Sequence, residues 1–196
     1  MATLPDNVFE PPSRAEWRSW LEAHHARNGG VWLVLHKKAS PTPNLTYAEA
    51  VQEALCFGWI DSKPRKLDEL RSLLYFAPRK TKSGWSALNK ARIERLEAAG
   101  QMHPAGLALI EAAKADGSWA LLDGVDALDV PPDLQTALEA ADALDNWNAF
   151  PPSARRGILE WIVQAKTAPT RARRIQETAQ KAAQNERANQ WRKARP

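Results

Sequence analysis

The sequence predicts an α+β fold that is predominantly helical, with a small antiparallel β-sheet and a helical C-terminal subdomain. Three short runs, 31–37, 59–66 and 71–77, are rich in apolar and β-branched residues and are bounded by Gly, Pro or charged residues, which is typical of strands. Most of the remaining chain places its apolar residues at helical spacing. With 196 residues and 44% hydrophobic content, the chain can bury a core without disulfides.

The first helix is predicted from its start signal and its apolar stripe. Ser13 and Glu16 have the spacing of a capping box. Four residues then recur at i, i+3, i+4 and i+7: Trp17, Trp20, Leu21 and His24. The sequence Asn-Gly-Gly at 28–30 ends this helix, and the strand 31–37 follows.

The other two strands are predicted to form a hairpin. A second capping box, Thr46 with Glu49, begins the helix that precedes the strand 59–66. The polar sequence KLDEL then has the length of a hairpin connection to the strand 71–77. Pro78 ends the pairing because it has no N–H to donate to a ladder.

Downstream of the hairpin the sequence predicts helices. A long helix runs from Trp85 to Ala99, with Leu88 on its apolar face, and another begins at Pro104 with Leu107 directed inward.

Three parts of the chain differ in composition, and they define the predicted domains. Residues 1–129 form an α+β core domain that contains the small antiparallel sheet. Residues 130–178 form a helical C-terminal subdomain. Residues 179–196 are basic and lose the apolar stripe, so we expect a frayed tail.

Charge is distributed in blocks along the chain, although the net charge is only +4. Residues 1–62 and 96–169 are acidic, with net charges of −2 and −7, whereas residues 63–95 and 170–196 are basic, with +7 and +6. Either the opposite blocks face each other within the fold, or the basic segments form a surface that binds anions.

The sequence lacks the signals of several functional classes. It has no G-x-S-x-G motif and no Walker A loop, and its four histidines have no carboxylate or cysteine at ligand spacing, so we expect no catalytic residues, no metal site and no cofactor. The single cysteine, Cys56, lies in an apolar run and is expected to pack in the core. We find no signal peptide and no apolar run of about 20 residues, and we expect a cytoplasmic protein without membrane insertion.

An anion-binding site is predicted after the hairpin. Ser83 and Gly84 precede a helix, where free backbone N–H groups and the helix dipole favour a phosphate or carboxylate. The predicted ligand-binding residues are Asp61, Arg79, Lys80, Lys82, Ser83, Trp85, Ser86 and Asn89. In the alternative interpretation, Ser83 only caps the helix, Trp85 packs in the core and the cations are solvated.

Two other functions use overlapping residues. A nucleic-acid-binding accessory protein would use Trp59, Tyr75 and Trp85 to stack bases, with an arm that carries Trp191. The cations of that alternative are Arg65, Arg79, Lys82, Arg171 and Arg174. An enzyme would have to use Asp61, which more readily forms a structural ion pair with Arg65 or Arg79.

Several sequence blocks, in one order, carry a resemblance to a known family. They are VWLVLHKK, LTYAEAVQEALCFGWID, APRKTKSGWSALNKARIERLEAAGQMHPAG and FPPSARRGILEWIVQAKTAPTRARRI. Over about residues 14–178 the chain resembles the bacteriocin-protection, or YdeI/OmpD-associated, family. The family motifs correspond to Gly58, Trp59, Ile60, Asp61, Pro78, Arg79, Ser83, Trp85, Ser86, Asn89, Trp161, Ala165, Lys166, Thr170, Arg171, Arg173, Arg174 and Ile175. The chain departs from the pattern at Ser62, where the family commonly has glycine, and after residue 178.

The resemblance implies a bacterial protein linked to bacteriocin or antimicrobial-peptide resistance and to an outer-membrane porin. We therefore expect a non-catalytic stress or bacteriocin-resistance protein that binds an anionic small molecule or protein partner through the loop and helix start at 79–89. Nucleic-acid binding is the alternative.

Overall fold

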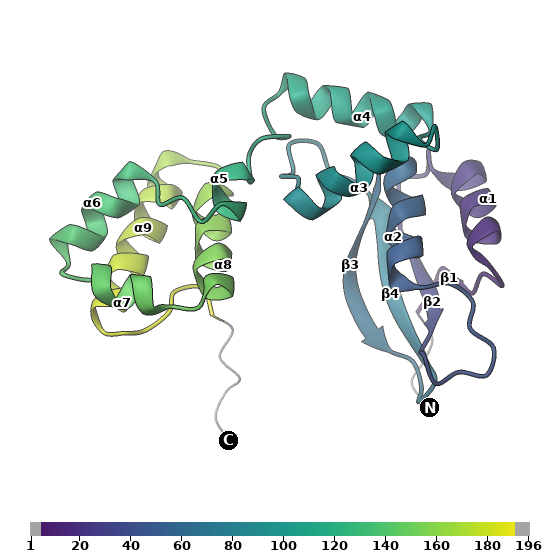
Figure 1. The fold of residues 1–196 in the computed structure, drawn as a ribbon, viewed down its shortest axis with the longest axis horizontal. Coiled ribbons are helices and arrows are strands. Elements are labelled where there is room, and N and C mark those ends of the chain that lie inside the picture. The colour runs from purple at the N-terminus through teal and green to yellow at the C-terminus, as the bar shows by residue number, and fades with distance from the viewer. Residues whose placement is uncertain (1–4, 191–196) are drawn as a thin grey trace. The chain divides into compact units, whose positions relative to one another are not determined.

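The computed structural model describes residues 5–190, and the chain divides into two compact units (Figure 1). The first unit comprises the residues up to Ser83 together with Leu88–Trp119. The second comprises Gly84–Ala87 together with the residues from Ala120 onward. The division therefore lies ahead of residue 129, because the short helix α5 (Asp123–Asp126) belongs to the second unit.

A mixed four-stranded sheet forms the centre of the first unit, in the order β1 (Val8–Phe9), β2 (Val31–His36), β4 (Arg71–Pro78) and β3 (Trp59–Lys66). The three predicted strands pair antiparallel, β2 with β4 and β4 with β3. The prediction of a purely antiparallel sheet is wrong, because β1 pairs parallel with β2. A helix connects these two strands, and such a crossover brings the chain back in the same direction. The sequence did not indicate β1, because a strand of two residues is too short to show alternation of apolar and polar residues.

Helices α1 (Arg14–His24) and α2 (Tyr47–Cys56) begin at their predicted capping residues and pack with the sheet. Trp17 of α1 is fully buried. Its indole N–H donates to the Ala50 carbonyl of α2 (3.0 Å), and its ring lies 5.4 Å from that of Phe76 in β4. The aromatic stripe predicted from the sequence therefore holds α1 against both α2 and the sheet.

A buried carboxylate also joins these two helices. Glu53 of α2 is only 4% exposed. Arg14 Nε donates to one of its oxygens (2.6 Å), and Arg18 Nη1 donates to the other (2.7 Å). Because both oxygens have a charged donor, the cost of burying Glu53 is offset.

Helices α3 (Ala87–Ala98) and α4 (Pro104–Ala115) complete the first unit, although α3 starts in the segment that groups with the second. The prediction that Leu88 and Leu107 point inward is wrong, since they are 62% and 39% exposed. The apolar face of α3 is centred on Ile93, and Leu88 lies about 140° from it around the helix.

The second unit is helical, as predicted for the C-terminal part of the chain. After α5 it contains α6 (Pro132–Ala140), α7 (Leu144–Ala149), α8 (Pro152–Val163) and α9 (Ala168–Ala183). Proline stands in the first turn of α6, α8 and α9, where its missing N–H costs nothing. The helices enclose an apolar core whose largest members are Leu134, Leu138, Trp147, Phe150, Ile158, Leu159, Ile162 and Ile175.

The residues predicted to form a frayed tail are partly ordered into this core. Helix α9 continues to Ala183, and Ala179 and Ala182 are buried. Beyond the helix, Ala188 is 1% exposed and belongs to the same core. The segment from residue 179 is basic and its buried residues are small, so the sequence did not indicate that it packs in the core. Trp191, which the nucleic-acid alternative places on an arm, lies outside the described residues.

Candidate functional site

The eight residues predicted to bind an anion do not belong to one unit. Trp85 and Ser86 fall in the second unit, whereas Asp61, Arg79, Lys80, Lys82, Ser83 and Asn89 fall in the first. Trp85 is 2% exposed, which fits the core role considered as the alternative.

A turn directly after β4 carries the predicted cations. Ser83 Oγ donates to the Lys80 carbonyl (2.7 Å), and Lys82 has a φ of 59°, in the left-handed region. The side chains of Lys80 and Lys82 are exposed. Arg79 is 9% exposed, its backbone N–H donates to the Gly58 carbonyl (2.9 Å), and burial lowers the pKa of its guanidinium to about 10. At neutral pH the turn therefore presents two ammonium groups beside a buried cation.

The backbone N–H at the start of α3 already binds a carboxylate of the protein. The helix begins at Ala87, later than the predicted Trp85. The Ala87 N–H donates to Asp126 Oδ2 (2.6 Å), and Asp126 also accepts from Arg156 Nε (2.8 Å). An external anion would have to displace Asp126 to reach this N–H group.

Two predicted residues, Asp61 and Asn89, each accept a hydrogen bond from a residue that the sequence did not single out. The Tyr47 hydroxyl donates to Asp61 Oδ2 (3.0 Å), and Arg92 Nη1 donates to Asn89 Oδ1 (2.9 Å). Desolvation and the charge of Asp61 raise the pKa of Tyr47, while the positive charge of Arg92 opposes this shift. Tyr47 is the first residue of α2 and is 50% exposed.

Asp61 and Tyr47 border a pocket of about 370 Å³. It lies among the start of α2 and the strands β2, β3 and β4. The pairing of β3 with β4 shifts register between Asp61 and Pro64, and both residues line the pocket. A β-bulge of this kind redirects side chains along a strand.

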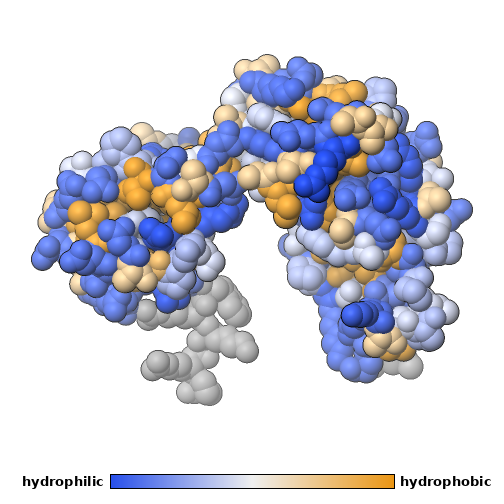
Figure 2. All heavy atoms as spheres, viewed as in Figure 1, coloured by the Kyte–Doolittle hydropathy of each residue, from blue (hydrophilic) through white to orange (hydrophobic). Residues whose placement is uncertain are grey.

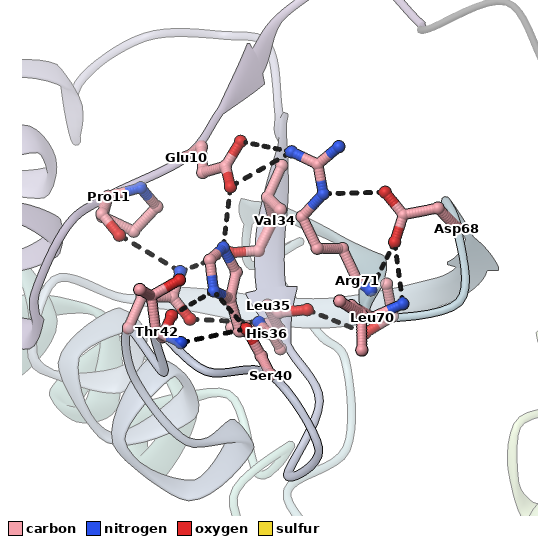
Figure 3. Close-up of polar contacts among 12 residues, drawn as sticks. Glu10, Pro11, Val34, Leu35, His36, Ser40, Thr42, Asp68, Leu70 and Arg71 are labelled. Atoms are coloured by element: carbon pink, nitrogen blue, oxygen red, sulfur yellow. Dashed lines mark hydrogen bonds and ion pairs between the residues drawn. The ribbon is translucent and has the colours of Figure 1, made fainter.

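A polar network lies where β2 ends and β4 begins, next to the pocket residues Leu35 and Ser72 (Figure 3). His36 Nε2 lies 2.7 Å from Glu10 Oε1, and His36 Nδ1 bonds to the Thr42 carbonyl. Arg71 donates to Glu10 Oε2 (3.1 Å) and to Asp68 Oδ2 (2.8 Å). The hydrogen bonds from His36 and Arg71 lower the pKa of Glu10. His36 thus helps to fix the chain around β1, a role its position in the sequence does not reveal.

The cations of the nucleic-acid alternative are divided between the units. Arg65 is exposed on the edge strand β3 of the first unit. In the second unit, Arg171 donates to both oxygens of Asp133 (2.7 and 2.9 Å). The Arg174 guanidinium lies 5.0 Å from the centre of the Trp161 ring. Arg171 and Arg174 therefore have structural partners, and the Arg171 partner belongs to the acidic segment 96–169.

A groove of about 570 Å³ lies between α6 and α9 in the second unit. Its floor consists mostly of alanines, and Asp133 and Arg171 also line it. On the face visible in Figure 2, apolar residues gather over these two helices.

Among residues 5–190, no three His, Cys, Asp or Glu side chains are placed to hold a metal ion. No helix in the described chain is both long and apolar enough to span a bilayer. Cys56 is buried, and desolvation raises the pKa of its thiol, which disfavours the reactive thiolate.

The molecule therefore has an α+β unit with separate polar sites and a helical unit with an apolar groove. Comparison with protein families matches residues 9–109 to a domain of unknown function, DUF8412, and residues 127–185 to the family described as "Bacteriocin-protection, YdeI or OmpD-Associated". The chain belongs to the DUF8412 family, whose model covers slightly more than half of its length. Residues 127–185, in the second unit, are similar to the bacteriocin-protection family. No curated protein and no solved structure matches the chain.

Proposed function

We propose that this protein is a non-catalytic binding protein in bacterial protection against bacteriocins or related antimicrobial stress. It would act by binding an anionic ligand or partner through the turn at 80–83. The description of the family matched by residues 127–185 supports the protective role. The observation that carries the binding role is the closed turn, which holds Lys80 and Lys82 beside the buried Arg79.

The turn is suited to an anion because its backbone is fixed before a ligand arrives. The hydrogen bond from Ser83 to Lys80 closes it, so that little backbone entropy is lost on binding. Each charge-assisted hydrogen bond to an anion contributes about 1.5 to 3 kcal/mol before desolvation and side-chain ordering are subtracted. Two lysines then give an expected affinity in the millimolar to micromolar range.

The proposed surface is narrower than the segment 79–89 that the sequence suggested. Asp126 occupies the Ala87 N–H at the start of α3, and Asn89 is engaged by Arg92. Asp61 would repel an anion and lies in a different pocket. The first contacts of the ligand are therefore assigned to Lys80 and Lys82.

Anion binding can be tested with the double variant Lys80→Ala, Lys82→Ala. Thermal-shift and calorimetric titrations would use inorganic phosphate, a nucleoside triphosphate and a short single-stranded oligonucleotide. The matched control is Lys38→Ala, Lys63→Ala, which removes two exposed lysines elsewhere in the same unit. We expect the double variant to lose the ligand-dependent shift and the control to keep it. An equal response of the two variants would refute the assignment to this turn.

The nucleic-acid alternative is judged by the oligonucleotide titration. If the protein binds nucleic acid, its affinity for the oligonucleotide should fall steeply as the salt concentration rises. The substitutions Arg65→Ala and Arg171→Ala should lower this affinity as well. If only the lysines of the turn matter, and phosphate competes with the oligonucleotide, the site recognises an anion and not a nucleic acid.

The protective role needs a cellular test. A bacteriocin-sensitive strain would express the wild-type protein or the Lys80→Ala, Lys82→Ala variant, and the minimum inhibitory concentration of the bacteriocin would be measured. Protection by the wild type and its loss in the variant would connect the turn to the role. Equal sensitivity with and without the wild-type protein would contradict the protective role itself.

A further inference from the structure

We infer that the pocket beside Asp61 is a second binding site, which takes a primary ammonium group carried on an apolar chain. This site is independent of the anion-binding proposal, because Lys80 and Lys82 are not among its lining residues. Its argument rests on the hydrogen-bond directions and the walls of the pocket.

The carboxylate of Asp61 has capacity for a further donor. The Tyr47 hydroxyl donates to Oδ2 (3.0 Å), and among the described residues no donor reaches Oδ1. A carboxylate accepts several hydrogen bonds through its two oxygens. Asp61 is therefore held in place by one bond and can still accept from a ligand.

Two serine hydroxyls of the pocket are also left as acceptors. Ser62 Oγ donates its proton to the Tyr75 carbonyl (3.4 Å), and Ser72 Oγ donates to the Leu35 carbonyl (3.3 Å). A hydroxyl that has used its one proton can still accept through its lone pairs. Both serines line the pocket with Asp61, so a ligand there meets one carboxylate and two hydroxyl acceptors.

These acceptors match an ammonium group. Its three N–H donors equal the three acceptors, and its charge complements Asp61, the only charged residue among the described ones that line the pocket. An anion would meet acceptors and a like charge. The rest of the wall is apolar, with Leu35, Leu74 and Pro64, and can hold an alkyl chain.

Two features set the expected affinity. Tyr47 is 50% exposed and lines the pocket, so its ring can contact a bound cation. Arg92, whose charge acts on Tyr47, adds a positive charge near the site and weakens the attraction. A pocket of 370 Å³ that is open to solvent then suggests a dissociation constant of about 1 mM.

The ammonium group could belong to a free alkylamine or to a lysine side chain of a peptide, and the test separates them. Full-length protein labelled with ¹⁵N and ¹³C would be titrated with butylamine, with N-acetyl-lysine amide, and with butanol as the uncharged control. We expect both amines to shift the resonances of Tyr47, Asp61 and Ser72, and butanol to leave them unchanged. Preference for the lysine derivative would indicate a peptide, and preference for butylamine a free amine.

Asp61→Asn is the decisive variant, because the amide oxygen still accepts from Tyr47 while the charge is lost. We expect it to weaken amine binding at least tenfold, and Ser72→Ala to weaken it severalfold. Glu94→Gln, which removes an exposed carboxylate from α3 of the same unit, should bind as the wild type does. The inference is overturned if Asp61→Asn binds butylamine as tightly as the wild type, if butanol reproduces the shifts, or if neither amine shifts the pocket resonances at about 20 mM.

Discussion

The two units bury different chemistry. The first unit buries Glu53 and Arg79, and it contains all four histidines of the chain. In the described part of the second unit, Thr178 is the one buried polar side chain, and it donates to the Arg174 carbonyl (2.8 Å). The second unit is therefore stabilised mainly by apolar burial, whereas the first also depends on specific polar partners.

This difference predicts which changes destabilise each unit. A buried charge that loses its partner is strongly destabilising, whereas an apolar helical core responds chiefly to changes in volume. Loss of a polar partner and mild acid should therefore affect the first unit more than the second.

The largest effect is expected from Glu53→Gln. The substitution keeps the shape of the side chain but removes the charge that Arg14 and Arg18 contact, and Glu53 is 5% exposed at its side chain. Breaking such a pair should cost the first unit about 3 kcal/mol, measured by denaturant unfolding. Glu97→Gln, at an exposed position in α3, is the control. A loss below that of the control variant would show that the arginines do not stabilise the buried carboxylate.

A pair of glycines compares packing in the two units. In Gly106→Ala of α4, the new Cβ would lie 2.2 Å from the Cys56 carbonyl oxygen, so α4 must move away from α2 at a cost of about 2 kcal/mol. In Gly157→Ala of α8, nothing lies within 4 Å of the new Cβ, and helix propensity should add up to about 1 kcal/mol of stability. The midpoint temperature of thermal unfolding, followed by circular dichroism, should fall in Gly106→Ala and rise in Gly157→Ala. A change of the same sign in both variants would contradict the close approach of α4 to α2.

The smallest effect is expected in the second unit, from Arg171→Ala. Its ion pair with Asp133 is partly exposed, and such pairs contribute about 0.5 kcal/mol. Adding Arg174→Ala should lower stability further, because this guanidinium packs on Trp161. If denaturant midpoints stay unchanged while oligonucleotide binding is lost, the two arginines serve nucleic-acid binding instead.

Much of the fold could be predicted because local signals and tertiary packing agree. The capping residues Ser13 and Thr46 start α1 and α2, and the strands 31–36, 59–66 and 71–78 follow their apolar patterns. The parallel pairing of β1 could not be predicted, because two residues carry no periodicity. The course of the chain after residue 178 was obscured because small alanines, not large apolar residues, contact the core.

The candidate sites were less predictable, since they depend on residues far apart in sequence. Asp61 and the cations could be proposed from the sequence because of their charge. Tyr47 and Arg92 could not, because only the fold brings them close to Asp61. The helix start at Ala87 looked available for an anion because its partner, Asp126, lies 39 residues away. A sequence shows which donors exist, but not which acceptors of the same chain already bind them.

The pH response tests the difference between the units most directly, through His103. Its Nδ1 accepts from the Ala105 N–H (3.2 Å) and caps α4, and desolvation together with His25 lowers its pKa. Because the unfolded state then binds the proton first, the stability that His103 contributes is present above about pH 6.5 and is lost as pH falls below it.

Hydrogen exchange, normalised to intrinsic rates, would be measured at about pH 7 and about pH 5.5, above the range where carboxylates titrate. We predict that amides at the start of α4 lose protection at the lower pH, that those of α8 and α9 do not, and that His103→Asn, which keeps a capping oxygen, removes the difference. Equal loss of protection in both units, or none at the start of α4, would contradict the account.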